Sequence, residues 1–220
     1  FALASLAGGP SGLDDVFAVH ETRDGQVWVG TRAGLVVLDP RQRKAERLDL
    51  TGTPDEQPLV TTMRVDHTGR LWVGTLNHGV FAVDTARGQW ERIHSAPSGS
   101  AEGFPSRAIL SIAATQHLLF VGTWGQGVFR TPLDASPFRL LTAGPASTGL
   151  RHENVTAVLA SDEPGRPWVG SFGGGPQRVV TLGDSTEVIL ASGSRLVVSA
   201  GFGSSDRNVD LEGEALFRVR

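Results

Sequence analysis

The chain has 220 residues, 40% of them hydrophobic, with 28 Gly, 12 Pro and no Cys, and its formal net charge at pH 7 is -3. A chain of this length can bury a core of its own. Its slightly acidic balance offers no basic face for nucleic acid or an anionic membrane surface. The lack of cysteine excludes disulfides, thiolate metal sites and cysteine nucleophiles. No apolar run reaches the roughly 18 residues of a membrane span, so this segment is not expected to insert directly into a membrane.

The most informative feature is a short segment that recurs along the chain. It reads WVGT at 28–31, WVGT at 72–75, FVGT at 120–123, WVGS at 168–171 and, more weakly, VVSA at 197–200. Successive copies are 44, 48, 48 and 29 residues apart. A period of ~40–50 residues built from short strands is typical of propeller blades, each a four-stranded antiparallel sheet. The pattern predicts an all-β propeller of about five blades, which form either a complete five-bladed ring or part of a larger one, such as a seven-bladed ring.

Each predicted unit takes the same elements in the same order. An apolar strand opens the unit, at 16–21, 60–66, 109–114, 155–160 and 187–191. A tight turn follows, where a glycine such as Gly25 or Gly69 supplies the positive φ angle of a short hairpin; the third unit lacks this glycine. The recurring strand, a glycine loop, a second apolar strand and a more polar outer strand complete the unit. The predicted units cover 13–50, 58–94, 107–142, 153–182 and 186–220, and residues 1–6 resemble the outer strand of a neighbouring or closing blade.

Alternation along the recurring strand directs its aromatic residue to one face and the next valine to the other. Because the aromatic residue stands at one place in every unit, we expect it in a layer between blades rather than as a sugar-stacking platform. The glycine two positions later is expected where sheets approach too closely for a Cβ atom. The predicted repeat core is Trp28, Gly30, Trp72, Gly74, Phe120, Gly122, Trp168 and Gly170.

Three stretches resemble the two-component regulator propeller repeat: VFAVHETRDGQVWVGTRAGLVVLD, VTTMRVDHTGRLWVGTLNHGVFAVD and GLRHENVTAVLASDEPGRPWVGSFGGG. The resemblance covers most of residues 13–182, with departures in the third unit and a degenerate fifth unit. It implies a periplasmic or extracellular sensor module of hybrid histidine kinases and related bacterial signalling proteins, without catalysis or a cofactor. A signal peptide, membrane anchor or output domain would then lie outside this chain, and a homodimer could form through flanking domains. The resemblance carries no fixed ligand residues.

Candidate binding residues come from two sets of loops that vary while the strands repeat, which is where a rigid scaffold tends to carry binding residues. Aromatic, amide and guanidinium groups around one mouth would suit a small polar or carbohydrate-like ligand. Trp124 and Phe172 would equally suit a cap over the layer between blades. The candidates are Arg32, Asn77, His78, Trp124, Gln126 and Phe172, between second and third strands, with Arg151 and His152, in a loop that links two blades.

Other kinds of function have weaker support. The six histidines show no pair at metal-ligand spacing, so no metal site is predicted. There is no Gly-x-Ser-x-Gly elbow and no nucleophile and base pair. Two facing loop carboxylates would favour a propeller hydrolase or lyase, and a large apolar rim would favour a scaffold for a protein partner. The candidate carboxylates are Asp14, Asp15, Glu153 and Asp206.

Overall fold

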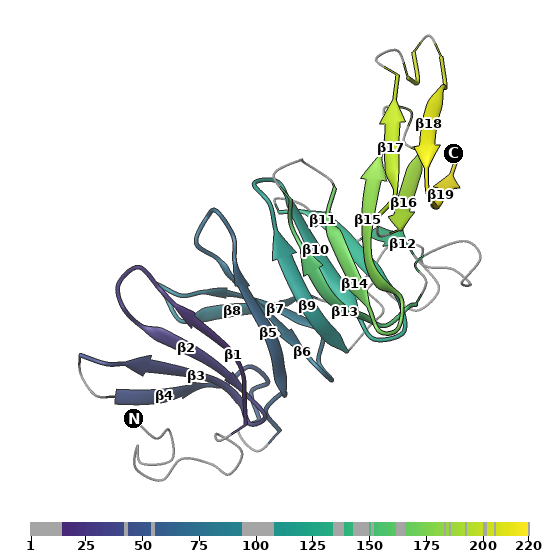
Figure 1. The fold of residues 1–220 in the computed structure, drawn as a ribbon. Helices are drawn as coiled ribbons and strands as arrows, with labels where there is room; N and C mark the ends of the chain where they lie inside the picture. Colours follow the sequence, from purple (N-terminus) through teal and green to yellow (C-terminus); the bar gives the residue numbers. More distant parts are fainter. Residues whose placement is uncertain are drawn as a thin grey trace. The chain divides into compact units, whose positions relative to one another are not determined.

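A computed structural model describes residues 15–41, 44–53, 56–93, 108–133, 139–142, 150, 152–161, 166–182, 184, 186–191, 193–199, 202–204 and 206–219. Its strands, β1 to β19, form five sheets, and the described residues contain no helix. The predicted all-β class is therefore confirmed (Figure 1). The chain divides into two compact units, Phe1–Ile112 and Ala113–Arg220.

The first two sheets each contain four strands that pair in chain order, as in a propeller blade. Their hairpin turns contain Gly25 and Gly69 at φ angles of 85° and 89°, as predicted. The first sheet contains β1 (Val16–Glu21), β2 (Val27–Thr31), β3 (Gly34–Asp39) and β4 (Lys44–Leu48). The second contains β5 (Val60–Val65), β6 (Leu71–Thr75), β7 (Val80–Asp84) and β8 (Gln89–Ile93).

The third sheet has the same order although its first turn lacks glycine. Thr115 builds that turn, because its backbone N–H donates to the Leu118 carbonyl at 2.8 Å and its hydroxyl oxygen accepts the Leu118 N–H at 3.0 Å. The side chain of Thr115 thus replaces the backbone freedom that glycine supplies in the first two sheets. The strands are β9 (Ile109–Ala114), β10 (Leu118–Thr123), β11 (Val128–Pro132) and β12 (Arg139–Thr142).

The last part of the chain differs from the prediction of a separate fifth unit that starts at 187–191. This segment, β16, pairs with β15 as the fourth strand of the fourth sheet. β19 pairs with the other edge of β16, and apolar residues of β16 pack with the β17–β18 hairpin. The fourth sheet contains β13 (Val155–Leu159), β14 (Trp168–Ser171), β15 (Gly175–Thr181), β16 (Glu187–Ala191) and β19 (Ala215–Arg218). The hairpin of β17 (Arg195–Val198) and β18 (Val209–Glu212) forms the fifth sheet.

Apolar layers hold neighbouring sheets together within each unit. In the first unit Trp28 packs against the second sheet, in a cluster with Val73 and Phe81. In the second unit Phe120 packs in a cluster with Val169 and Ile189 of the fourth sheet. The exposed fractions of Trp28, Trp72 and Phe120 are 2%, 3% and 0%, so these aromatic residues are core residues as predicted.

Trp168 departs from that prediction, since 41% of its surface is exposed. The Arg178 guanidinium lies 5.3 Å from the centre of its ring. A Cβ atom on Gly170, two residues later, would meet only Ala157 of the same sheet, at 3.5 Å from its Cβ. The close contact that Gly30 and Gly74 make with the next sheet is therefore missing at Gly170 among the described residues.

The glycines of the recurring strand fit closely against the next sheet. A Cβ atom on Gly30 would lie 2.5 Å from Val60, and one on Gly74 would lie 2.7 Å from Ile109. Val60 and Ile109 are fully buried and begin β5 and β9. The predicted close approach is therefore confirmed at Gly30 and Gly74, while Gly122 is buried within β10.

Replacing Gly74 by alanine tests this close fit. We expect Gly74→Ala to lower the free energy of unfolding by about 1–3 kcal/mol, because the added methyl group overpacks the layer between sheets. The measurement is urea denaturation followed by tryptophan fluorescence. Gly170→Ala is the matched control, with little expected effect, because its Cβ contact at 3.5 Å is an ordinary one. Equal losses for both variants would contradict the role of crowding.

Asp66 ties the turn before β6 to the core. Its carboxylate accepts hydrogen bonds from the N–H groups of Thr68 and Arg70 at 2.8 and 3.2 Å, and from the Trp72 indole at 2.8 Å. Burial, the largest single influence, raises the pKa of Asp66. The hydrogen bonds from Thr68, Trp72 and the backbone together outweigh it and hold the pKa below the ordinary 3.8.

This shift predicts an acid-dependent part of the stability. A carboxyl group with a lower pKa in the folded state stabilises the fold above its unfolded pKa, and this contribution is lost as the pH falls through the folded pKa. We expect Asp66→Asn to lower the free energy of unfolding at neutral pH and to flatten its decline between about pH 5 and pH 2. Urea denaturation across that range measures both effects, with Glu91→Gln, on the exposed face of β8, as the control. Parallel curves for Asp66→Asn and the unchanged protein would exclude this role.

Candidate functional site

In the first three sheets, the loop after the recurring strand is closed by a buried threonine hydroxyl. The hydroxyl of Thr75 donates to the Gly79 carbonyl at 2.8 Å, and that of Thr123 donates to the Gly127 carbonyl at 2.9 Å. The residue that follows the hydroxyl residue is left exposed at the strand end. This position is occupied in turn by Arg32, Leu76, Trp124 and Phe172.

Two of these side chains meet in the second unit. The ring centres of Trp124 and Phe172 are 6.4 Å apart with an angle of 45° between the planes. Both stay in contact with solvent, with exposed fractions of 53% and 64%. Exposed aromatic neighbours of this kind offer an apolar surface to a ligand.

A segment before β13 holds the two loops in place. The Glu153 carbonyl accepts the Gly127 N–H at 2.9 Å, and the Asn154 carbonyl accepts the Phe172 N–H at 2.9 Å. The β10–β11 and β14–β15 loops are thus fastened to consecutive residues of one segment. Backbone hydrogen bonds fix both loops, so the backbone that carries each of the two aromatic side chains has a defined position.

Polar groups surround this aromatic pair. The Nε2 atom of His152 would lie 3.3 Å from a Cβ atom built on Gly173, so the imidazole borders the β14–β15 loop. The Gln126 Oε1 atom is covered and accepts no hydrogen bond from the described residues. We call Trp124, Gln126, His152 and Phe172 the aromatic loop site. It presents the apolar surface of two aromatic rings, and beneath it lies an amide oxygen without a donor.

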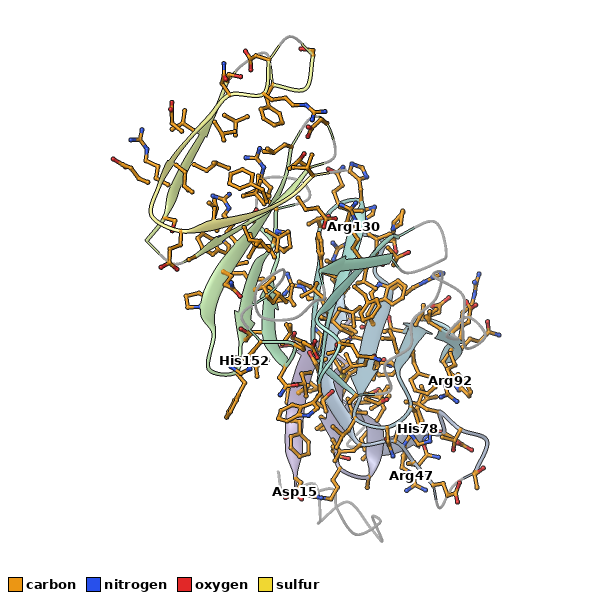
Figure 2. The ribbon with its side chains drawn as sticks, turned by 90° about the vertical axis from the view of Figure 1, so that its right-hand side faces the viewer. Asp15, Arg47, His78, Arg92, Arg130 and His152 are labelled. Atoms are coloured by element: carbon orange, nitrogen blue, oxygen red, sulfur yellow. The ribbon has the colours of Figure 1, made fainter. Side chains whose placement is uncertain are left out.

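The predicted site residues of the first unit have other contacts. The Arg32 guanidinium forms an ion pair with Asp15 at 2.5 Å, with side chains 60% and 52% exposed. The His78 N–H donates to the Thr75 hydroxyl at 3.0 Å, and the His78 carbonyl accepts Nε–H of Arg92 at 3.0 Å, two residues that Figure 2 labels. Asn77 is exposed in the same loop. The structure therefore assigns Arg32, Asn77 and His78 to the first unit and the aromatic loop site to the second.

Two further predicted positions fall outside the described residues, namely Arg151 and Asp14. Of the other candidate carboxylates, Asp15 pairs with Arg32, and Asp206 accepts a hydrogen bond from the Ser199 hydroxyl. No group of three or more His, Asp or Glu side chains within the described ranges is placed to hold a metal ion. The described part of the chain also has no helix long and apolar enough to cross a membrane.

Sequence reasoning missed two contributors to these loops. Leu76 occupies the position of Trp124 in the second sheet and is 44% exposed. An alignment of the WVGT copies places Leu76 at the position of Trp124, so the sequence contains the signal for Leu76. The Asn154 carbonyl, which holds the Phe172 loop, has no signal of its own, because any residue can supply a backbone carbonyl.

Comparison with known proteins supports the repeat. Residues 11–33 match the family described as two component regulator propeller, within the first unit. This match confirms the resemblance that the sequence indicates. No curated protein matches the chain.

Solved structures match a much larger part of the chain. The extracellular domain described as that of the hybrid two component system BT4673 from B. thetaiotaomicron has a TM-score of 0.60 and 20% identity, over 86% of this chain and 23% of that chain. The corresponding domain of BT3049 has a TM-score of 0.60 and 14% identity, over 84% and 28%. A catalytically inactive virginiamycin B lyase from Staphylococcus aureus, with quinupristin, has a TM-score of 0.57 and 11% identity, over 80% and 55%.

These similarities establish the β-propeller fold. This chain spans about a quarter of the length of the two extracellular domains. The lyase shows that propellers of similar shape also occur in an enzyme. Fold alone does not decide between binding and catalysis.

The exposure of Trp124 gives a test of whether it caps the core. We expect Trp124→Ala to change the free energy of unfolding by no more than about 0.5 kcal/mol, because half of the side chain is already solvated. Phe120→Ala in the preceding strand is expected to cost about 3–5 kcal/mol. Urea denaturation measures both variants. Comparable losses would assign Trp124 to the layer between sheets and remove it as a binding residue.

Proposed function

We propose that this chain is a non-catalytic ligand-binding module of a bacterial signal-transduction protein. Two findings support the signalling part: the match of residues 11–33 and the fold shared with extracellular domains of two-component systems. By the same similarity, the module works in the periplasm or outside the cell. Its output domain and membrane anchor belong to other parts of the protein.

The aromatic loop site is the proposed place of binding, and its ligand is small and polar or carbohydrate-like. The carrying observation is the exposed pair of Trp124 and Phe172 beside the unpartnered acceptor of Gln126. A sugar ring has C–H faces that pack on aromatic rings and hydroxyl groups that donate hydrogen bonds. Such a ligand would cover the two rings and pair the Gln126 oxygen, whose burial without a partner otherwise costs free energy.

A binding screen with single variants tests this proposal. A ligand that binds only the native state raises the unfolding midpoint by mass action. We expect at least one neutral oligosaccharide in a panel to raise the midpoint, and calorimetry to give its affinity. Trp124→Ala and Phe172→Ala should abolish the shift. Trp168→Phe, an exposed aromatic residue at the other end of β14, should retain it.

Other results would redirect the assignment. Binding that survives Trp124→Ala would exclude the aromatic loop site. Release of a new product from a bound saccharide, lost in Glu153→Gln, would favour a propeller hydrolase or lyase. A partner protein bound in the absence of any small ligand, by a surface apart from Trp124, would favour an interaction scaffold.

A further inference from the structure

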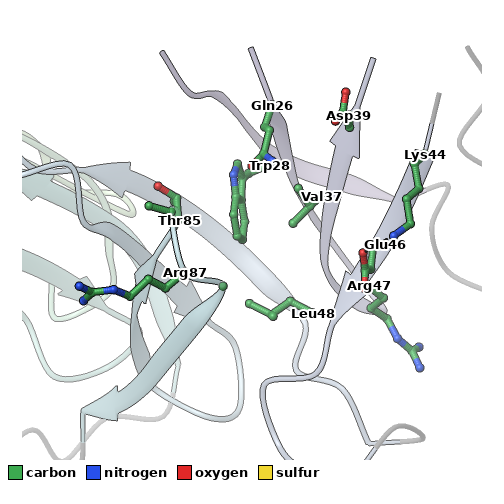
Figure 3. A pocket seen from close by; sticks show the side chains of 12 residues that line it. Gln26, Trp28, Val37, Asp39, Lys44, Glu46, Arg47, Leu48, Thr85 and Arg87 are labelled. Carbon is green, nitrogen blue, oxygen red and sulfur yellow. Dashed lines mark hydrogen bonds and ion pairs between the residues drawn. The ribbon is translucent and has the colours of Figure 1, made fainter. Parts of the chain in front are cut away.

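A pocket lies in the first unit, apart from the aromatic loop site. It has a volume of about 470 Å³ and lies between strands β2, β3 and β4 of the first sheet and the Thr85–Gly88 turn of the second. Trp28, Val37 and Leu48 form its apolar wall. Figure 3 shows the Trp28 indole between Val37 and Thr85. A volume of this size falls in the range that holds small organic ligands.

The buried indole in this wall lacks a hydrogen-bond partner. Trp28 is 2% exposed, and its Nε1–H group finds no acceptor among the described residues. The equivalent group of Trp72 donates to Asp66 at 2.8 Å. An indole nitrogen is a donor only, so a ligand that pairs with the Trp28 indole must supply a hydrogen-bond acceptor.

The difference between the two sheets comes from one residue. Asp66 stands six positions before Trp72, and Thr22 stands six positions before Trp28. The turns have the same backbone bonds, since Thr22 N–H donates to Gln26 at 2.9 Å and Asp66 N–H donates to Arg70 at 3.0 Å. The Thr22 hydroxyl is directed to Asp24 at 2.5 Å instead. The first sheet therefore keeps the turn and lacks the carboxylate.

The rim of the pocket carries both positive and negative groups. Lys44, Arg47 and Arg87 line it together with Asp39 and Glu46. Lys44 pairs with Glu46 at 3.0 Å, and Arg87 reaches Asp84 at 3.4 Å while its side chain stays 74% exposed. With Asp84 counted, three carboxylates match the three cations, so these groups carry no net charge.

We propose that this pocket binds a small carboxylate with an apolar body. One carboxylate oxygen accepts the Trp28 indole hydrogen, in the role that Asp66 has toward Trp72. The apolar body lies against Val37 and Leu48. Neighbouring side chains cover the Trp28 nitrogen, so binding includes a small movement of the pocket wall. The site is independent of the aromatic loop site, because all its residues belong to the first unit.

The indole signals of the ¹⁵N-labelled chain test this site directly. The five tryptophans give separate indole N–H signals, which Trp→Phe variants assign. On titration with phenylacetate we expect the Trp28 signal to move and the Trp72 signal to stay. 2-Phenylethanol, which lacks the charge, should bind more weakly. Trp28→Phe should bind phenylacetate about tenfold more weakly, the loss of one net hydrogen bond.

Thr22→Asp provides the converse variant, because it places in the first turn the acceptor that Asp66 supplies in the second. We expect it to raise the unfolding midpoint, to move the Trp28 signal without ligand, and to weaken phenylacetate binding about tenfold. Thr22→Ala, which removes the hydroxyl and adds no acceptor, should leave binding unchanged.

Three results would overturn the proposal. The first is a Trp28 signal that does not move with phenylacetate while the Trp72 signal shows a folded protein. The second is a shift of the Trp124 signal alone, which would place the carboxylate at the aromatic loop site. The third is unchanged affinity in Trp28→Phe, which remains a valid test if Thr22→Asp fails to fold.

Discussion

In the first unit, the first residue of each following sheet covers the recurring glycine of the sheet before it. The rest of the unit depends on this close packing. Val60 covers Gly30, and Ile109 covers Gly74, at distances that leave no room for a Cβ atom. The Thr61 hydroxyl adds a hydrogen bond of 2.5 Å to the Ile109 carbonyl. This spacing brings the neighbouring strands close enough for Trp28 and Trp72 to be buried. The glycine and the aromatic residue of the repeat therefore belong to one packing arrangement.

Both proposed sites follow from where this packing ends. At one end of the recurring strands, the side chain that follows the strand is left in solvent, as for Trp124 and Phe172. At the outer strands the Thr85–Gly88 turn leaves the pocket beside Trp28. The first site exposes aromatic surface on a fixed frame, and the second has a buried donor without an acceptor. The scaffold is common to the first four sheets, whereas single residues at its edges define the chemistry.

Much of this arrangement could be predicted from sequence, because the repeat fixes strand, turn and core positions together. The buried Trp28, Trp72 and Phe120 and the crowded Gly30 and Gly74 follow from their recurrence. The partner of β16 could not be predicted, since an apolar strand pairs with whichever edge is available. Trp168 has the core pattern and is exposed, because burial depends on the neighbouring sheet. The contact between Trp124 and Phe172 joins loops 48 residues apart, which local pattern does not encode.

The packing of Val60 on Gly30 can be observed directly by nuclear Overhauser spectroscopy on the folded chain. We expect strong cross-peaks between the Val60 methyl groups and the Gly30 α-protons, and between the Ile109 γ-methyl group and the Gly74 α-protons. Their presence would establish the close fit that sets the spacing of the sheets. Their absence in a protein whose Trp72 and Phe81 signals show a folded core would contradict it.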